Sequence, residues 1–177
     1  MDIFSNRPLY DPSAVQFMRD ELTAIGFDEL FTPEDVDRAI NTNNDETVLV
    51  FINSVCGCAA GSARPGFSKA LQNERIPNRI TTVFAGQEKA AVARVRDHWL
   101  NGQPPSSPSA ALFKNGELVF MVHRHEIERH DADEIAEHVK TLFDQHCTGV
   151  GPSVPAEHLF QVNHAKTCGS KIPKYEG

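Results

Sequence analysis

The feature that most constrains the fold of this chain is a run of apolar residues that leads directly into two cysteines. Residues 47–53 (TVLVFIN) are nearly all apolar and rich in β-branched side chains, which is typical of a strand buried on both faces. A Cys-Gly-Cys sequence follows at residues 56–58, and from Arg64 onward we predict a helix that Pro65 interrupts or kinks. The sequence therefore predicts two thiols at a turn from a buried strand to a helix, which indicates an α/β fold.

Other elements are indicated by hydrophobic periodicity and by turn signals. Asn115 and Gly116 stand between two apolar runs, and Asn-Gly in that position is a strong signal for a β-hairpin. The order of the elements predicts an α/β fold with a mixed central sheet, flanking helices and an extra N-terminal helix. We predict strands at 47–53, 80–84, 110–113 and 117–122, and helices at 11–26, 32–40, 64–71, 88–100 and 131–146.

The starts of two helices are marked by residues that can cap them. Thr32 precedes Pro33 and two acidic residues, and proline and acids both suit the first turn of a helix. Asp131 precedes the last helix in the same way. We therefore expect Thr32 and Asp131 to be N-caps.

The composition changes beyond residue 148, where glycine, proline and scattered polar residues replace the hydrophobic periodicity. We expect one domain over residues 1–148 and a C-terminal extension over residues 149–177. Only Leu159, Phe160 and Val162 offer apolar area in the extension. It is therefore predicted to be a tail that either docks on the domain or remains mobile.

Charge and composition argue against several classes of partner and location. The net charge of −7 and the pI of about 5.6 disfavour binding to nucleic acid or to an anionic membrane, because phosphate groups require a basic patch. The first residues lack the basic and apolar regions of a secretory signal, and no stretch reaches the length of a membrane span. We therefore expect a cytoplasmic protein, in which closely spaced thiols are more often catalytic or metal-binding than structural.

The position of the two thiols predicts their chemistry. A thiolate attacks a disulfide when it is ionised and accessible, and a helix N-terminus favours the ionised form. We assign Cys56 as the attacking thiol because it precedes the helix, and Cys58 as the resolving thiol, with Gly57 removing bulk between them. A disulfide across one residue closes a strained ring, so the oxidised pair should suit removal of a small thiol from a mixed disulfide. Cys56 could also act alone if an external thiol completes the cycle.

Two other interpretations of the cysteines remain open. Both could be small buried hydrophobic residues at a packed turn, in an interaction protein whose thiols are inert. They could instead hold zinc or an iron–sulfur cluster, but the other ligands would have to come from Cys147, Cys168 or histidines, since there is no second paired motif. We favour thiol exchange and expect neither a metal nor another cofactor.

Two further groups of side chains have more than one possible role. His123, His125 and His130 precede the last helix, and alternation along a strand would put the first two on one side, where a metal could bind. We expect them to be surface or loop-packing residues instead. Arg64 lies about one and a half turns beyond Cys58, where it could support the thiolate or be solvated.

Ser107 and Pro108 stand immediately before the predicted hairpin. This segment resembles thioredoxins, which carry a cis-proline followed at the same offsets by a Phe-Lys-Asn-Gly hairpin, here residues 113–116. The resemblance implies a thioredoxin-like three-layer fold in which Pro108 is cis and faces Cys56. An ordinary trans-proline in a proline-rich loop is the alternative.

The chain resembles the bacilliredoxin family more closely. The marks of that family are the Cys-Gly-Cys sequence at 56–58 followed by Ala-Ala-Gly and Arg-Pro, together with the segments 19–27 and 124–131. The resemblance covers about Tyr10 to about Thr148.

This resemblance implies a function and a set of partners. Cys56 would be the nucleophile and Cys58 the second thiol in removing bacillithiol from protein mixed disulfides, with weak disulfide reductase or isomerase activity. The partners would be S-thiolated proteins and a low-molecular-weight thiol. Residues 150–177, which include Cys168, have no counterpart in the pattern, and the sequence does not indicate the oligomeric state.

Overall fold

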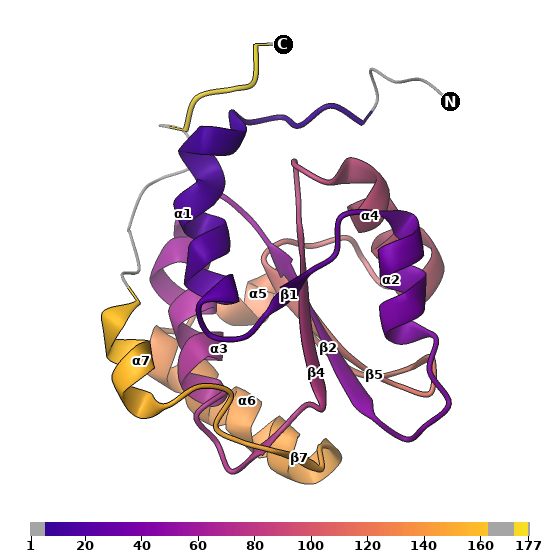
Figure 1. Cartoon of the computed structure of the whole chain (residues 1–177), viewed down its shortest axis with the longest axis vertical. Coiled ribbons are helices and arrows are strands. Elements are labelled where there is room, and N and C mark those ends of the chain that lie inside the picture. The colour runs from indigo at the N-terminus through magenta and orange to yellow at the C-terminus, as the bar shows by residue number, and fades with distance from the viewer. Residues whose placement is uncertain (1–5, 163–171, 177) are drawn as a thin grey trace.

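The computed structural model describes residues 6–162 and 172–176 and has a five-stranded sheet at its centre (Figure 1). The strands lie in the order β1-β4-β2-β5-β6. β4 pairs in parallel with β1 and β2, whereas β5 pairs in antiparallel fashion with β2 and β6. Their bounds are β1 (Asp28–Glu29), β2 (Thr47–Asn53), β4 (Arg79–Phe84), β5 (Ser109–Lys114) and β6 (Glu117–Val122).

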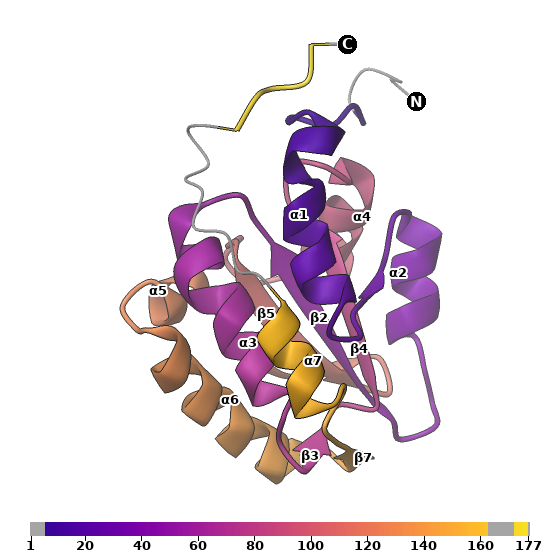
Figure 2. The same cartoon turned by 60° about the vertical axis from the view of Figure 1, so that its left-hand side comes forward.

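The central strand β2 contributes buried side chains to both faces of the sheet, as its sequence predicts. Leu49 and Phe51 join a hydrophobic cluster with α3 and α6, whereas Val48, Val50 and Ile52 join a second cluster with α2 and α4. The sheet is therefore the middle of three layers (Figure 2), and the fold is the predicted thioredoxin-like α/β fold. The covering helices are α3 (Arg64–Ala70) and α6 (Ala132–His146) on one face, and α2 (Pro33–Ile40) and α4 (Lys89–Arg94) on the other.

The extra N-terminal helix, α1 (Pro12–Thr23), lies beside α3. The side chain of Asp11 caps it by accepting a hydrogen bond from the N–H of Ser13 at 2.9 Å. Met18 of α1 packs in a small hydrophobic cluster with Val55, the residue that precedes Cys56. The helix thus covers the end of the sheet from which the two cysteines emerge.

The caps predicted from the sequence are present. The Thr32 hydroxyl accepts the N–H of Asp35 at 3.1 Å, and the Asp35 carboxylate accepts the N–H of Thr32 at the same distance. Asp131 and Glu134 form the same reciprocal pair at the start of α6. Both helix starts are therefore fixed by local residues.

The Asn115-Gly116 turn joins β5 to β6, as predicted. Both residues have positive φ, 51° and 75°, a requirement of the tight hairpin turn that asparagine and glycine meet readily. Across the sheet, Ser109 of β5 lies opposite Ile52 of β2. The residues that precede β5 therefore lie beside the carboxyl end of β2.

The helix after the cysteines differs from the prediction. The interruption expected at Pro65 lies one turn earlier, in a π-helical segment over Ala59–Ala63, and Pro65 falls in the first turn of α3. Proline lacks an N–H and clashes with the carbonyl four residues before it, and the wider π-helical turn accommodates both effects. The helix predicted over 88–100 likewise divides into α4 and a π-helical segment, Val95–Trp99.

Short elements that the sequence analysis missed attach the C-terminal extension to the domain. β7 (Gly149–Val150) pairs in antiparallel fashion with β3 (Arg75–Ile76), and α7 (Ala156–Gln161) follows. Strands of two residues carry no periodicity, so the sequence could not reveal them.

The extension docks again at residues 172–176. Ile172 joins the cluster that contains Val55, and the carbonyl of Pro173 accepts the N–H of Asp11 at 2.9 Å. Cys168, which the metal interpretation invoked, lies outside the described residues.

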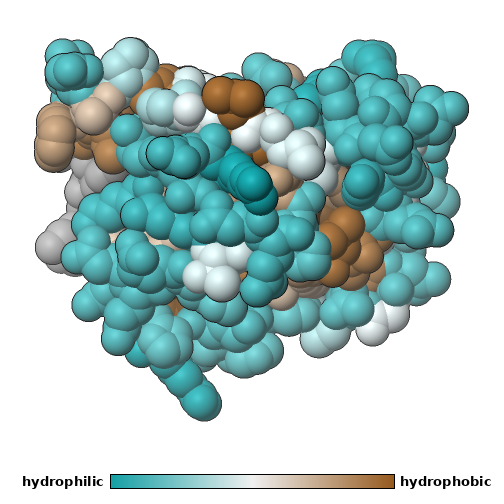
Figure 3. Space-filling model, turned by 90° about the horizontal axis from the view of Figure 1, so that it is seen from below, coloured by the Kyte–Doolittle hydropathy of each residue, from teal (hydrophilic) through white to brown (hydrophobic). Residues whose placement is uncertain are grey.

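The surface shown in Figure 3 is mainly hydrophilic, with hydrophobic residues in small, separate patches. Across the described residues, no helix is both long enough and apolar enough to cross a membrane.

Candidate active site

Cys56 lies where β2 gives way to the helical segment before α3. Its carbonyl accepts hydrogen bonds from the N–H groups of Ala59 and Ala60, at 3.1 and 3.2 Å. Both Cys56 and Cys58 are half-buried, and Gly57 between them is exposed. The first thiol therefore occupies the helix N-terminus that the sequence predicts, and neither thiol is sealed in the core.

The two thiols touch, yet they differ in acidity. They are unbonded, with a distance of 2.8 Å between their Sγ atoms. Burial alone would raise the pKa of Cys56, but hydrogen bonds from Cys58, Ser54 and the N–H of Ala59, together with the charge of Arg124, lower it below its ordinary value. Burial raises the pKa of Cys58 to about 11, and its hydrogen bond and charge interaction with Cys56 act in the same direction. Cys56 is therefore the thiol that ionises first.

Arg124 is a charged residue beside the thiols that the sequence analysis did not assign to the site. It is the first residue of α5 (Arg124–Ile127), and its Nη1 donates to the carbonyl of Ser107 at 3.4 Å. The charges of Cys58 and Cys56 raise the pKa of Arg124, so the guanidinium lies near both sulfurs. No local motif signals this role, because the hairpin brings Arg124 to the site from a distant part of the chain.

The loop before β5 supplies the predicted cis-proline. The Ser107–Pro108 peptide bond is cis, as the resemblance to thioredoxins implies, and Pro108 is buried while Ser107 is half-buried. Arg124 links this loop to the thiols, since it binds the Ser107 carbonyl and interacts with both sulfurs. The proline loop and the thiols therefore meet at one end of the sheet.

Of the two roles considered for Arg64 from the sequence, the structure excludes one. The expectation that it is solvated is wrong, because its side chain is completely buried. It is not among the groups that shift the pKa of Cys56 or Cys58, and its guanidinium instead binds Glu21 of α1 and the end of β2. The sequence could not indicate this, because Glu21 lies 43 residues earlier.

The histidines occupy a loop and a helix start rather than a strand. β6 ends before His123, so the alternation that would place His123 and His125 on one side of a strand does not apply. Their rings stack with centroids 5.6 Å apart, and His130 is exposed. Within residues 6–162 and 172–176, no three His, Cys, Asp or Glu side chains are placed to share a metal ion.

Cys147 is separated from the thiol pair. It is only 2 % exposed; burial raises the pKa of its thiol to about 11, against the opposing effect of a hydrogen bond with Thr47. Thr47 begins β2, and Cys56 follows the other end of that strand. At about 3.3 Å per residue, roughly 20 Å of strand lies between them, so Cys147 is not a partner of Cys56 in this fold.

Replacing Arg124 with methionine is expected to make the Cys56 thiolate harder to form, because the variant removes a positive charge that favours it. Alkylation by iodoacetamide measured against pH reports the change, since the thiolate is the reactive form. We expect alkylation at neutral pH to become about two- to fivefold slower, the size of effect given by a partly exposed charge. Arg129→Met removes a charge that does not shift the pKa of Cys56 and should leave the profile unchanged. An unaltered profile in Arg124→Met would contradict the assignment of Arg124 to the site.

The sheet, the cis-proline loop and the touching thiols define a thioredoxin-like protein with a thiol–disulfide redox role. The family described as disulphide isomerase matches residues 10–147. A bacilliredoxin from Geobacillus kaustophilus is 48% identical over 143 residues, which are 81% of this chain and 96% of that protein. A bacilliredoxin from Salinibacter ruber is also 48% identical over 143 residues, 81% of this chain and 83% of that protein. The chain belongs to the bacilliredoxin family.

A third relative, a bacilliredoxin from Staphylococcus aureus, is 46% identical over 142 residues, which are 80% of this chain and 96% of that protein. The family resemblance noted in the sequence is thus confirmed, over nearly the residues expected. The family match ends at residue 147, so the docked C-terminal extension lies outside it.

Proposed function

We propose that the protein is a thiol–disulfide oxidoreductase that acts on mixed disulfides between proteins and a low-molecular-weight thiol of the bacillithiol type. Its partners are S-thiolated proteins and the small thiol, and its reaction takes place in the cytoplasm. The observation that carries the proposal is the contrast between two thiols 2.8 Å apart, with the pKa of Cys56 lowered and that of Cys58 raised to about 11. The bacilliredoxin names of the relatives support the choice of substrate.

In the first step, the Cys56 thiolate attacks the sulfur of the small thiol within the mixed disulfide. One S–S bond forms between Cys56 and the small thiol, and the S–S bond to the substrate protein breaks. The substrate protein leaves as a thiolate and takes up a proton. Arg124 and the N–H of Ala59 favour the charged state of Cys56 before the attack.

In the second step, Cys58 attacks Cys56 and releases the small thiol. Two of the causes that raise the pKa of Cys58 come from Cys56, through its hydrogen bond and its charge. Both disappear once the Cys56 sulfur is neutral and bonded to the small thiol, so Cys58 loses its proton more readily at that stage. The product is a Cys56–Cys58 disulfide, which has taken up the oxidation originally held by the substrate.

An external thiol returns the pair to its reduced form by two further exchange steps. The same external thiol can instead attack the mixed disulfide on Cys56, and Cys58 is then not required. Exchange with a disulfide of a protein substrate would give the isomerase or reductase activity that the family description suggests, and we include it as a secondary activity. The reaction requires sulfur and proton transfer alone, without a metal or another cofactor.

Other residues support the thiols in this proposal. Gly57 keeps the approach open, since a Cβ built at this position would meet nothing within 4 Å. Ser107 and Pro108 lie beside the carboxyl end of β2, from which the thiols follow, and Pro108 has no N–H with which to extend the sheet. Arg64 supports the thiols from the buried side, through its hydrogen bond to the carbonyl of Ser54.

Cys58→Ser is expected to stop the reaction after its first step, because no internal thiol can then displace the small thiol from Cys56. The variant should accumulate one small thiol per protein molecule, detected in the mass of the intact protein, whereas the wild type releases it. An excess of free small thiol should restore part of the turnover. Release from Cys58→Ser at the wild-type rate without added thiol would contradict the role given to Cys58.

The overall function is tested with a purified protein that carries bacillithiol or glutathione as a mixed disulfide. The wild type should reduce this substrate, with the released small thiol measured by mass spectrometry. Stoichiometric zinc or iron in elemental analysis of the purified protein would favour the alternative, a metal- or cluster-binding module. A Cys56 thiol that titrates at or above about 8.5 would favour an interaction protein with inert thiols.

A further inference from the structure

A buried ion pair lies behind the two thiols. The side chain of Arg64 is completely buried and Glu21 is only 2 % exposed. The Nε of Arg64 donates to a carboxylate oxygen of Glu21 at 2.5 Å. Arg64 starts α3, the helix that follows the cysteines, whereas Glu21 belongs to α1. The pair therefore connects the extra N-terminal helix to the helix of the redox turn.

Arg64 also holds the residues at the end of β2. Its Nη1 donates to the carbonyl of Ser54 at 2.9 Å and to Oδ1 of Asn53 at 3.1 Å. The same Asn53 oxygen accepts the N–H of Ser54 at 2.9 Å. Ser54 is thus fixed at its carbonyl by Arg64, and at its N–H by a side chain that Arg64 holds in place.

Ser54 in turn contacts Cys56. Its hydroxyl oxygen accepts the N–H of Cys56 at 3.3 Å, and a hydrogen bond from the Ser54 side chain favours the thiolate of Cys56. A hydroxyl group can accept one hydrogen bond while it donates another. The position of Ser54 therefore determines whether the thiolate receives this hydrogen bond.

Stability alone explains this ion pair poorly. Burying two charges is costly, and replacing a buried pair with well-packed apolar residues is often neutral or stabilising. Among the described residues, Nη2 of Arg64 has no hydrogen-bond partner although it is buried, which adds to the cost. What the guanidinium supplies is a rigid planar fork that binds Glu21, Asn53 and Ser54 together.

We propose that Glu21 and Arg64 are positioning residues that act through Asn53 and Ser54 to hold Cys56 in the geometry for attack. The inference rests on the proposed exchange reaction at Cys56. Glu21 fixes the guanidinium, the guanidinium fixes Ser54, and the Ser54 hydroxyl accepts the N–H of Cys56 and so holds this residue in place.

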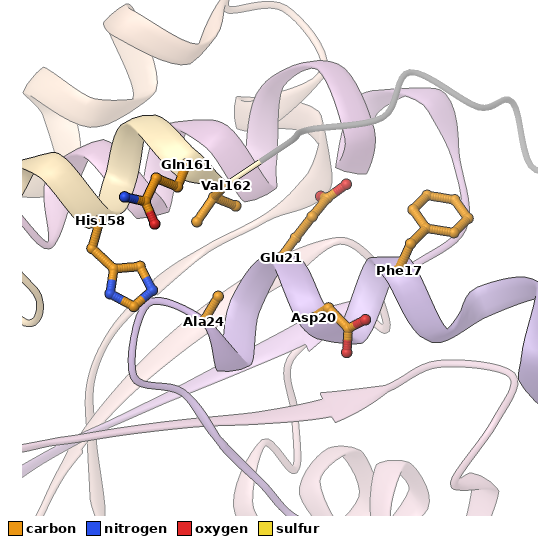
Figure 4. Close-up of a pocket in the computed structure, with 7 residues that line it drawn as sticks. All are labelled: Phe17, Asp20, Glu21, Ala24, His158, Gln161 and Val162. Carbon is orange, nitrogen blue, oxygen red and sulfur yellow. The ribbon is translucent and has the colours of Figure 1, made fainter.

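Space beside the ion pair makes its variants practical to test. Glu21 lines a cavity of about 420 Å³ between α1 and α7, and Figure 4 shows its side chain among those of both helices. His158 and Gln161 of α7 contribute polar groups to the same cavity. A changed side chain at position 21 can therefore rearrange without disrupting a close-packed core.

Arg64→Lys tests the proposal, because lysine keeps the positive charge opposite Glu21 but cannot bind three acceptors in a fork. We expect the Cys56 thiolate to form at higher pH, so that alkylation by iodoacetamide at neutral pH becomes about five- to tenfold slower. Reduction of the mixed-disulfide substrate should slow by a similar factor. The pH profile of alkylation is the deciding measurement, since a purely structural role would not move it.

Arg19→Lys is the matched control. Arg19 also lies in α1, its side chain is 11 % exposed, and it pairs with Glu29 and Glu88. It does not shift the pKa of Cys56. The control should lower the melting temperature as Arg64→Lys does, yet keep the wild-type alkylation profile. Identical profiles in the two variants and the wild type would overturn the proposal.

If Arg64→Lys does not fold, the alkylation profile of the double variant Glu21→Gln/Arg64→Gln tests the proposal instead. It removes both charges of the Glu21–Arg64 pair together, and glutamine lacks the guanidinium that reaches Ser54. Slower alkylation of Cys56 at neutral pH supports the proposal, and a wild-type profile overturns it.

Alkylation needs no disulfide substrate, so the two proposals can fail separately. A wild type that leaves mixed disulfides intact, combined with slower alkylation in Arg64→Lys, would remove the proposed function and keep the positioning role. A wild type that reduces them, combined with an unchanged alkylation profile in Arg64→Lys, would keep the proposed function and remove the positioning role.

Discussion

Cys56→Ser is expected to lower the reduction of a protein mixed disulfide to the rate observed without the protein. The variant replaces the ionisable sulfur at the helix N-terminus with a hydroxyl group that stays protonated at neutral pH and does not exchange with disulfides. Release of the small thiol, followed by mass spectrometry over time, measures the loss. We expect no partial activity, because burial, the largest cause of the raised pKa of Cys58, remains in this variant after the hydrogen bond and charge of Cys56 are gone, so Cys58 does not replace the attacking thiolate.

Cys147→Ser serves as the control for this experiment. It makes the same exchange of sulfur for oxygen, but at a buried position near Thr47, at the opposite end of β2. Turnover in this variant should match the wild type at a temperature where both are folded. Wild-type turnover by Cys56→Ser would remove Cys56 from the mechanism.

Phe51→Ala is expected to lower the free energy of unfolding by about 3–5 kcal/mol, the cost of emptying a large buried site in a core. Phe51 lies in the middle of β2 and is completely buried. Its ring centroid is 5.9 Å from that of Phe27 and 5.1 Å from that of Phe67. Chemical denaturation of the reduced protein, with the midpoint and slope compared with those of the wild type, measures the change.

Phe160→Ala is the matched control, since it removes the same side chain from α7, where 86 % of Phe160 is exposed. Its effect should stay within about 0.5 kcal/mol. A loss smaller than about 1 kcal/mol in Phe51→Ala would contradict the packing of β2 between the two helical layers.

The parts of the fold that could be predicted from the sequence are those that depend on neighbouring residues. The apolar run of β2, the caps at Thr32 and Asp131 and the Asn115-Gly116 hairpin all follow from local patterns, and the structure has each of them. The cis state of Pro108 was implied by a family resemblance. The two-residue strands β3 and β7 and the π-helical segments have no local pattern, so they went unpredicted.

For the candidate site, the sequence placed Cys56 and Cys58 at the strand-to-helix turn, but it did not identify what surrounds them. Arg124 reaches the thiols through the return of a hairpin, and Arg64 is buried because Glu21, from another helix, neutralises its charge. Both effects require knowledge of which distant segments meet in space. An arginine in an isolated sequence is far more often solvated, which is why solvation was one of the two roles considered for Arg64.

Because Cys147 is buried, its thiol can be used to measure local unfolding of the surrounding structure. In a protein with Cys56, Cys58 and Cys168 replaced by serine, a thiol reagent could label the chain only when the end of α6 detaches and exposes this sulfur. The labelling rate would then report the free energy of that local opening. Such a protein would reveal whether a substitution at the redox turn loosens the far end of the sheet, without attaching any dye.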